Sequence, residues 1–108
     1  MIRSILFLHA KGDNYDSVVD YFEHAGVLER ASQKLGCHGA EIQIPMDGSG
    51  PVVVTALWDS ATAYQGWLDD PWRAESNAAL GELLDDSLGH ELRASLYKVS
   101  HSATSSAD

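Results

Sequence analysis

The amino-acid sequence predicts an α+β domain, and three features support this class. The chain has 108 residues, which suits one domain, since domains cluster near about 100–150 residues. Four short segments have the apolar or alternating pattern of β-strands, and others have helical periodicity. Their order, strand, helix, strand, strand, helix pair, strand, is typical of a split βαβ arrangement.

The first strand is expected at residues 2–9, where "IRSILFLH" is apolar enough to be covered on both faces. The polar stretch "KGDN" follows directly. A membrane span needs about 20 apolar residues, so this run is too short to be one. We therefore expect a strand here rather than a signal peptide, and no association with a membrane.

A long amphipathic helix is expected between Asp13 and Gly36, because apolar residues recur there at three- and four-residue steps. Asp13 or Asn14 is placed to cap its start, and Gly36 to terminate it. Gly26 weakens the expectation of an unbroken helix, because an interior glycine costs about 1 kcal/mol relative to alanine.

A β-hairpin is expected next. "HGAEIQI" (38–44) alternates apolar and polar residues, "PMDGSGP" supplies turn residues, and "VVVTALW" (52–58) has the composition of a second strand. The two strands should therefore pair with each other.

Two helices and a strand complete the domain. Ser60 can cap a short helix that runs to Leu68, and Asp70 with Pro71 can begin another that runs to about Leu84. The alternating segment "ELRASLYKV" (91–99) is expected to be the last strand. The domain then covers residues 1–99, and residues 100–108 are expected to form a disordered polar tail.

These elements form a ferredoxin-like α+β sandwich, with helices on one face of the sheet. The other face would carry the alternating apolar residues of four strands. Such a surface is unfavourable in water, so we expect two protomers to pack these faces together as a homodimeric α+β barrel.

Composition excludes several classes of function. Sixteen acidic residues against seven basic ones give a net charge of -9 without a basic cluster, so nucleic acid is not an expected partner. Cys37 is the one cysteine, which argues against a cysteine-based zinc site and favours the cytoplasm. The five histidines lack metal-site spacing, so no metal is expected.

Residues 52–80, "VVVTALWDSATAYQGWLDDPWRAESNAAL", resemble the signature of the antibiotic biosynthesis monooxygenase family. Its members are dimeric α+β barrels in which a strand ends in W-[ED]-S, a helix with an aromatic residue and a tryptophan follows, and a proline-started helix comes next. The likeness in element order covers nearly the whole chain. It implies a small-molecule cavity between sheet and helices, but members range from oxygenases of aromatic polyketides to haem degraders and isomerases.

The haem-degrading branch matches poorly. Trp67 stands where that branch has a tryptophan, but the place of its iron-ligating histidine falls at Ser76 and Asn77. An asparagine of its first strand would land near Leu6 or Leu8. The comparison therefore implies that the protein uses no haem, and we expect no cofactor.

The branch that oxidises anthrones without metal or flavin is a closer likeness. Trp58 and Tyr64 match positions that line or serve its substrate site, whereas an arginine, an asparagine and a histidine of that branch fall near Asn77, at Val54 and at Gln43. The resemblance implies a cofactor-independent monooxygenase that acts on an anthrone-, phenol- or quinol-like molecule with molecular oxygen. The alternatives are a non-catalytic small-molecule binder and a haem-binding relative that has replaced its ligand.

Seven residues are candidates for the site. The catalytic candidates are Tyr64, His38 and His9, and the substrate-binding candidates are Trp58, Trp67, Asn77 and Phe22. The two histidines end neighbouring strands, where either could act as a general base. The aromatic residues could equally fill the core, and Trp72 is expected at the surface or in a dimer contact.

Overall fold

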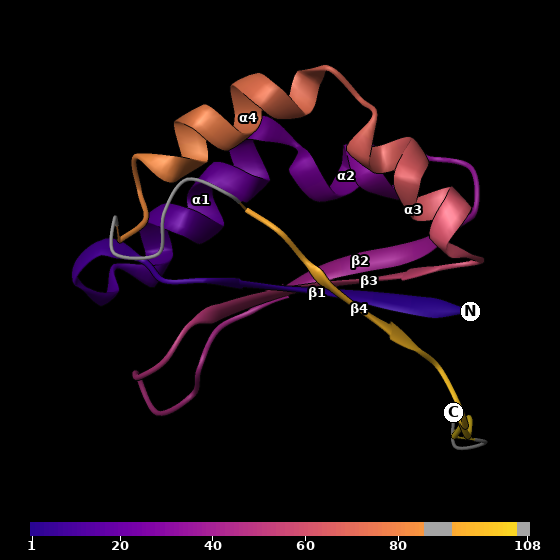
Figure 1. Cartoon of the computed structure of the whole chain (residues 1–108). Coiled ribbons are helices and arrows are strands. Elements are labelled where there is room, and N and C mark those ends of the chain that lie inside the picture. Colours follow the sequence, from indigo (N-terminus) through magenta and orange to yellow (C-terminus); the bar gives the residue numbers. More distant parts are fainter. Residues whose placement is uncertain (86–91, 106–108) are drawn as a thin grey trace.

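The computed structural model describes residues 1–85 and 92–105. In it, a four-stranded antiparallel sheet with strand order β2-β3-β1-β4 is covered on one face by helices (Figure 1). The elements in chain order are β1 (Ile2–Leu8), η1 (Lys11–Asp13), α1 (Tyr15–Ala25), α2 (Val27–Ser32), β2 (Cys37–Gln43), β3 (Val52–Trp58), α3 (Ala61–Leu68), α4 (Trp72–Gly81) and β4 (Ser95–Lys98). This order confirms the predicted ferredoxin-like α+β class.

The two faces of the sheet have different environments. Leu8 pairs with Val52, and both side chains are buried beneath the helices. One residue earlier Phe7 pairs with Val53, and because successive side chains alternate between faces, Phe7 lies on the open side, where it is 51% exposed. In this single chain β1 is therefore covered on one face, not on the two faces expected from its apolar composition.

The expected long helix is broken at Gly26. This residue has a φ of 68°, in the left-handed region, and its N–H donates to the carbonyl of Phe22 to end α1. Glycine adopts this conformation without the steric penalty of a Cβ atom, so α2 starts in a new direction. At the other end the Asn14 side chain accepts a hydrogen bond from Ser17 N–H, which identifies Asn14 as the N-cap.

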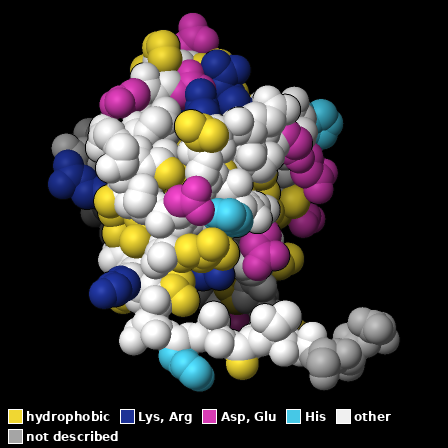
Figure 2. Space-filling view, turned by 90° about the vertical axis from the view of Figure 1, so that its right-hand side faces the viewer, with side chains coloured by type: hydrophobic (Ala, Val, Ile, Leu, Met, Phe, Trp, Pro, Cys, Tyr) yellow, Lys and Arg dark blue, Asp and Glu magenta, His cyan; other side chains and the backbone are white. Residues whose placement is uncertain are grey.

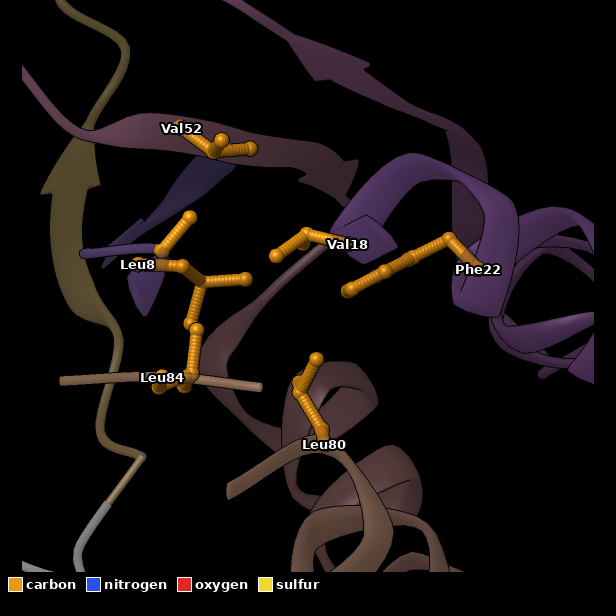
Figure 3. Packing of buried hydrophobic residues seen from close by; sticks show 7 residues of the cluster. Leu8, Val18, Phe22, Val52, Leu80 and Leu84 are labelled. Carbon is orange, nitrogen blue, oxygen red and sulfur yellow. The ribbon is translucent and has the colours of Figure 1, made fainter. Parts of the chain in front are cut away.

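The larger core cluster joins both layers. Leu8 and Val52 from the sheet point towards Val18 and Phe22 of α1 (Figure 3). Leu80 of α4 and Leu84 just after it close the cluster from the other side (Figure 3).

The helices α3 and α4 lie where the sequence predicts a helix pair, but α4 ends earlier than expected. Ser60 caps α3 through a 3.2 Å hydrogen bond from Ala63 N–H to its Oγ. The Asp70 carboxylate accepts from Trp72 N–H at the start of α4, and this helix ends at Gly81 instead of near Leu84. Beyond Gly81 the backbone turns, and Leu84 forms an isolated bridge with Ala10.

The last strand is shorter than predicted. Its pairing with β1 runs from Ile2↔Lys98 to Ile5↔Ser95, so Leu92 and Ala94 lie outside the strand. Residue 91, where that predicted strand starts, and residues 106–108 of the predicted tail lie outside the described residues.

The surface agrees with the charge composition. On the face shown in Figure 2, acidic side chains are spread over the surface and hydrophobic side chains lie exposed between them. A stretch of basic residues that could bind a phosphate backbone is not seen on this face. Among the described helices, none combines the length and the apolar character that crossing a bilayer requires.

Candidate functional site

A cavity of about 70 Å³ lies between the sheet and the helices. It sits where the larger core cluster meets a smaller one formed by Ala56, Trp58 and Tyr64, because both clusters contribute to its wall. Side chains that reach from one layer towards the other are short here, which leaves volume that larger residues would fill. These short residues are Ser4, Ala31, Ala40, Ala56, Ser76 and Ala94.

A wider groove of about 570 Å³ adjoins the cavity. The two spaces share five lining residues: Tyr64, Arg73, Asn77, Leu92 and Ala94. Typical small-molecule sites measure about 300–1,000 Å³. The cavity is too small for a polycyclic molecule, so such a guest could place one edge inside and its remainder in the groove.

Aromatic rings form one wall of the cavity. Trp58, at the end of β3, is 1% exposed, and its ring lies 5.4 Å from that of Tyr64 in an edge-on arrangement. Its Nε1–H donates to Ser4 Oγ at 3.1 Å. Because this donor is already satisfied, Trp58 offers a guest its apolar ring and no free hydrogen bond.

A second aromatic group connects the cavity wall to the surface of the helix layer. The guanidinium of Arg73 lies 5.3 Å from the ring centre of Trp67, and the Trp67 ring lies 6.4 Å from that of Trp72. Arg30 stacks on Trp72 at 4.9 Å. Such cation–π contacts hold a guanidinium in a fixed orientation. Trp67 and Arg73 line the cavity, whereas Trp72 stands outside it.

The polar groups of the site gather where cavity and groove meet. Within residues 1–85 and 92–105, neither the Tyr64 hydroxyl nor the Asn77 amide has a hydrogen-bond partner, although both residues line the two spaces. Burial raises the pKa of Tyr64 above its ordinary value of 10.0, and the nearby Arg73 guanidinium acts in the opposite direction. At neutral pH Tyr64 is therefore a protonated hydroxyl that can donate a hydrogen bond.

An ion-pair network adjoins the stacked rings, because Arg30 belongs to both. The buried Asp70 carboxylate accepts from Arg30 Nε at 2.7 Å, and Lys34 Nζ lies 2.8 Å from it. These hydrogen bonds, first from Arg30 and then from Lys34, hold the pKa of Asp70 well below its ordinary range. The network ties α2 to the start of α4, the helix that presents Arg73 and Asn77.

The structure brings five of the seven candidate residues to the cavity wall: Tyr64, Trp58, Trp67, Asn77 and Phe22. It does not bring the two histidines there. His38 forms a solvent-exposed pair with Asp59, and His9 lies exposed in the loop after β1. Both sit at strand ends, but the expectation that these strands are neighbours is wrong, because β3 lies between β1 and β2. Neither histidine is part of the walls of the cavity and groove.

Sequence reasoning missed Arg73. The residue is four positions before Asn77, which the family resemblance indicated. Residues four apart lie on the same face of a helix, so helical periodicity was the signal that could have found Arg73. In the aligned family pattern an arginine falls near Asn77, and here the guanidinium comes from one helical turn earlier.

The cavity wall offers little to hold a metal or haem. The described residues contain no cluster of metal-ligating side chains. Among the described lining residues, Tyr64 is the one that could ligate haem iron, as a phenolate. Burial disfavours that phenolate, since it raises the pKa. These residues do not fit a haem-iron site.

Comparison with known sequences gives a family match over most of the chain. The family model described as antibiotic biosynthesis monooxygenase matches residues 1–87. A comparison with curated proteins finds no match.

Solved structures share the fold across nearly the whole chain. Rv0793 from Mycobacterium tuberculosis is 16% identical with a TM-score of 0.75, covering 95% of this chain and 98% of its own. A variant of SnoaB, a cofactor-independent oxygenase from Streptomyces nogalater, is 16% identical with a TM-score of 0.64, covering 94% and 92%. A variant of MhuD with two manganese protoporphyrin IX molecules per active site is 19% identical with a TM-score of 0.66, covering 97% and 100%. At these identities the likeness establishes the fold and leaves the chemistry to the site.

Proposed function

Because this chain belongs to the antibiotic biosynthesis monooxygenase family, we propose that it is a cofactor-independent monooxygenase of a phenol-, quinol- or anthrone-like molecule. The observation that carries the proposal is the aromatic cavity with the Tyr64 hydroxyl at its mouth, which has no hydrogen-bond partner among the described residues. A flat apolar ring fits between aromatic walls, and its oxygen can accept the Tyr64 hydrogen bond.

The proposed reaction takes its electrons from the substrate. Loss of a proton from a phenol or anthrone leaves an electron-rich anion, which transfers one electron to molecular oxygen. The resulting superoxide and substrate radical combine to a peroxide anion, which takes up a proton from water to give the hydroperoxide. For an anthrone, loss of water then converts a CH₂ group to C=O, so one oxygen atom enters the product and the other leaves as water. The protein must therefore favour the anion and exclude bulk water.

The residues at the mouth suit that task. The Arg73 guanidinium carries a positive charge beside the cavity, and it already acts electrostatically on the Tyr64 hydroxyl. A positive charge in a poorly hydrated site lowers the free energy of a bound anion. We propose that Tyr64 donates to the substrate oxygen, that Asn77 orients it, and that Trp58, Trp67 and Phe22 hold the ring.

The proton would leave through the groove. Within the described lining residues no carboxylate or imidazole is present to accept it. Water in the groove is then the nearest acceptor, and His38 and His9 could act only through it. The substrate therefore needs a proton acidic enough for Arg73 to favour the anion.

We also propose that the protein works as a homodimer in the cytoplasm. On the open face of the sheet Phe7 and Tyr97 are 51% and 58% exposed, and the register places Ile5 of β1 and Val53 and Leu57 of β3 on the same face. Covering this face with a second copy removes apolar surface from water. The free thiol of Cys37 is compatible with a reducing compartment.

Oxygen uptake tests the proposed reaction. Chelator-treated protein is mixed with an anthrone or a dihydroxynaphthalene, and oxygen consumption and product are followed in air and under nitrogen. We expect uptake above the uncatalysed rate, and a fall of about 10²-fold or more for Tyr64→Phe, within the range for a positioned hydrogen-bond donor. Tyr15→Phe is the control, because the Tyr15 hydroxyl bonds the Gly50 carbonyl outside the cavity.

Other outcomes identify the alternatives. Uptake by Tyr64→Phe equal to that of the unmodified protein would contradict the site assignment. Because neither histidine lines the cavity, we expect His38→Ala and His9→Ala to reduce uptake less than Tyr64→Phe does. Binding of the aromatic without oxygen uptake would favour a non-catalytic binder, and a shifted haemin absorption band on mixing would favour a haem-binding relative.

A further inference from the structure

The cations of this chain are distributed unevenly around the site. The chain has sixteen acidic and seven basic residues. Among the described residues that line the cavity and groove, two are arginines, Arg73 and Arg93, and none is an aspartate or glutamate. Because Arg93 takes part in another interaction, the attraction for an anion is attributed to Arg73. A low-dielectric wall concentrates the field of such a charge.

Arg73 is positioned for an external partner. Its guanidinium donates one long hydrogen bond, 3.5 Å, to the carbonyl of Leu68 and lies over the ring of Trp67. Within the described part of the chain it has no carboxylate partner, whereas Arg30 and Lys34 both pair with Asp70. A guanidinium has five N–H donors, so most of those on Arg73 remain available.

Arg73 also lies at the right place in the site. It lines both the cavity and the groove, as does Asn77, whose amide has no partner in the part of the chain that the structure describes. A guest with one edge in the cavity would direct its outer substituents past this pair. The arrangement matches a planar carboxylate, which accepts two parallel hydrogen bonds from an arginine.

We propose that the natural guest is an aromatic molecule bearing a carboxylate, which binds Arg73 and Asn77 at the groove while the ring enters the cavity. This inference deepens the proposed function, because it names the chemical class of the guest of that same site. It does not depend on turnover, since a binder without oxygenase activity would need the same contacts.

Binding under nitrogen tests the inference separately from the reaction. Isothermal titration calorimetry compares the naphthoate anion with naphthamide, its neutral isostere, which has the same ring and shape. We expect naphthoate to bind about tenfold more tightly, as a charge-assisted hydrogen bond predicts. Raising the salt concentration from about 50 to about 500 mM should weaken naphthoate binding and leave naphthamide unchanged.

Variants assign the preference to one residue. Arg73→Gln should remove the preference for naphthoate, and Arg73→Lys should retain part of it. Lys11→Gln is the charge-matched control, because Lys11 is exposed and lies outside both spaces. Circular dichroism checks that each variant is folded. The comparison of naphthoate with naphthamide on the unmodified protein tests the preference even if a variant fails to fold.

Three results would overturn the inference. The two probes could bind equally, naphthoate could fail to bind at millimolar concentration, or Lys11→Gln and Arg73→Gln could have equal effects on naphthoate binding. If naphthoate is preferred through Arg73 but no aromatic supports oxygen uptake, the inference holds and the proposed monooxygenase fails. If neutral phenols support uptake and the preference is absent, the monooxygenase holds and the inference fails.

Discussion

Asp70 and Arg30 form a two-point ion pair between residues forty positions apart, with Arg30 Nε 2.7 Å from Asp70 Oδ2 and Nη2 3.1 Å from Oδ1. Only 2% of the Asp70 side chain is accessible to solvent. The same carboxylate binds Lys34 and accepts from Trp72 N–H. One side chain thus joins α2 to the first turn of α4 and fixes the helix that carries Arg73.

Replacing Asp70 by asparagine should destabilise the fold. The variant removes the charge that compensates Arg30 and Lys34 but preserves the shape of the side chain. We expect the midpoint of thermal unfolding to fall by roughly 5–10 °C, as measured by circular dichroism. Asp69→Asn is the control, since the neighbouring Asp69 is exposed and its carboxylate accepts a hydrogen bond from the Gln65 side chain. Equal effects of the two substitutions would show that the ion pair is not responsible.

The Asp70 network should also make stability depend on pH in acid. The pKa of Asp70 in the folded state lies below its ordinary value of 3.8, mainly because Arg30 and Lys34 donate to it. The stabilisation is therefore complete above that value and decreases as the pH falls below it, because the unfolded chain then takes up a proton at Asp70 while the folded chain still keeps it ionised. Urea unfolding at several pH values should show the difference between unmodified protein and Asp70→Asn shrinking below about pH 4. A difference that stays constant to lower pH would contradict this assignment.

Gly36 should tolerate no side chain. Its φ is +87°, and a Cβ atom there would lie 2.6 Å from the Cβ of Ala63. Gly48→Ala measures the loss of folding free energy from a positive φ alone, about 1–2 kcal/mol. Its φ is +76°, and nothing lies within 4 Å of the added Cβ atom. Chemical denaturation should show Gly36→Ala to be worse than Gly48→Ala by about 1–3 kcal/mol.

The clash at Gly36 can be separated from the backbone strain. In the background of Ala63→Gly, the Gly36→Ala substitution should cost about as much as Gly48→Ala does. A cost that remains at its original value in this background would exclude the contact with Ala63 as the cause.

Filling the cavity should abolish binding without unfolding the protein. Ala56 lies in the middle of β3 and lines the cavity, so Ala56→Leu places its added carbons in space that is already empty. We expect the free energy of unfolding to change by less than about 1.5 kcal/mol and the affinity for an aromatic guest to fall more than about tenfold. Ala79→Leu, on the exposed side of α4, is the control. Unchanged guest affinity in Ala56→Leu would place the binding site elsewhere.

The open sheet face should determine the oligomeric state. Phe7→Glu places a charge on this face near the end of β1, and a charge there without a partner opposes burial in an interface. Light scattering coupled to size-exclusion chromatography should find a dimer for the unmodified protein and a monomer for Phe7→Glu. Leu35→Glu is the control, because Leu35 is 95% exposed in the loop before β2. A monomeric unmodified protein at micromolar concentration would disprove the proposed dimer.

The local features of this protein follow from its sequence. Alternation and helical periodicity predict the order of the elements and the α+β class, because each pattern reflects which side of a strand or helix is buried. Caps are equally local, and Asn14 and Ser60 act where their side chains can reach the next backbone N–H groups. The motif at residues 52–80 indicates the family through its residue types and their spacing alone.

The site depended on contacts between distant segments, which periodicity does not encode. Asp70 has the sequence context of a helix cap, and only the tertiary fold places Arg30 of α2 and the nearby Lys34 beside it as partners. Small residues such as Ala40, Ala56 and Ala94 look unremarkable singly, but they leave a cavity because the fold brings them to the wall of the same space. The same packing brings Arg73 to the mouth of that cavity and leaves His38 and His9 outside, since a strand end can point to solvent as readily as to a site.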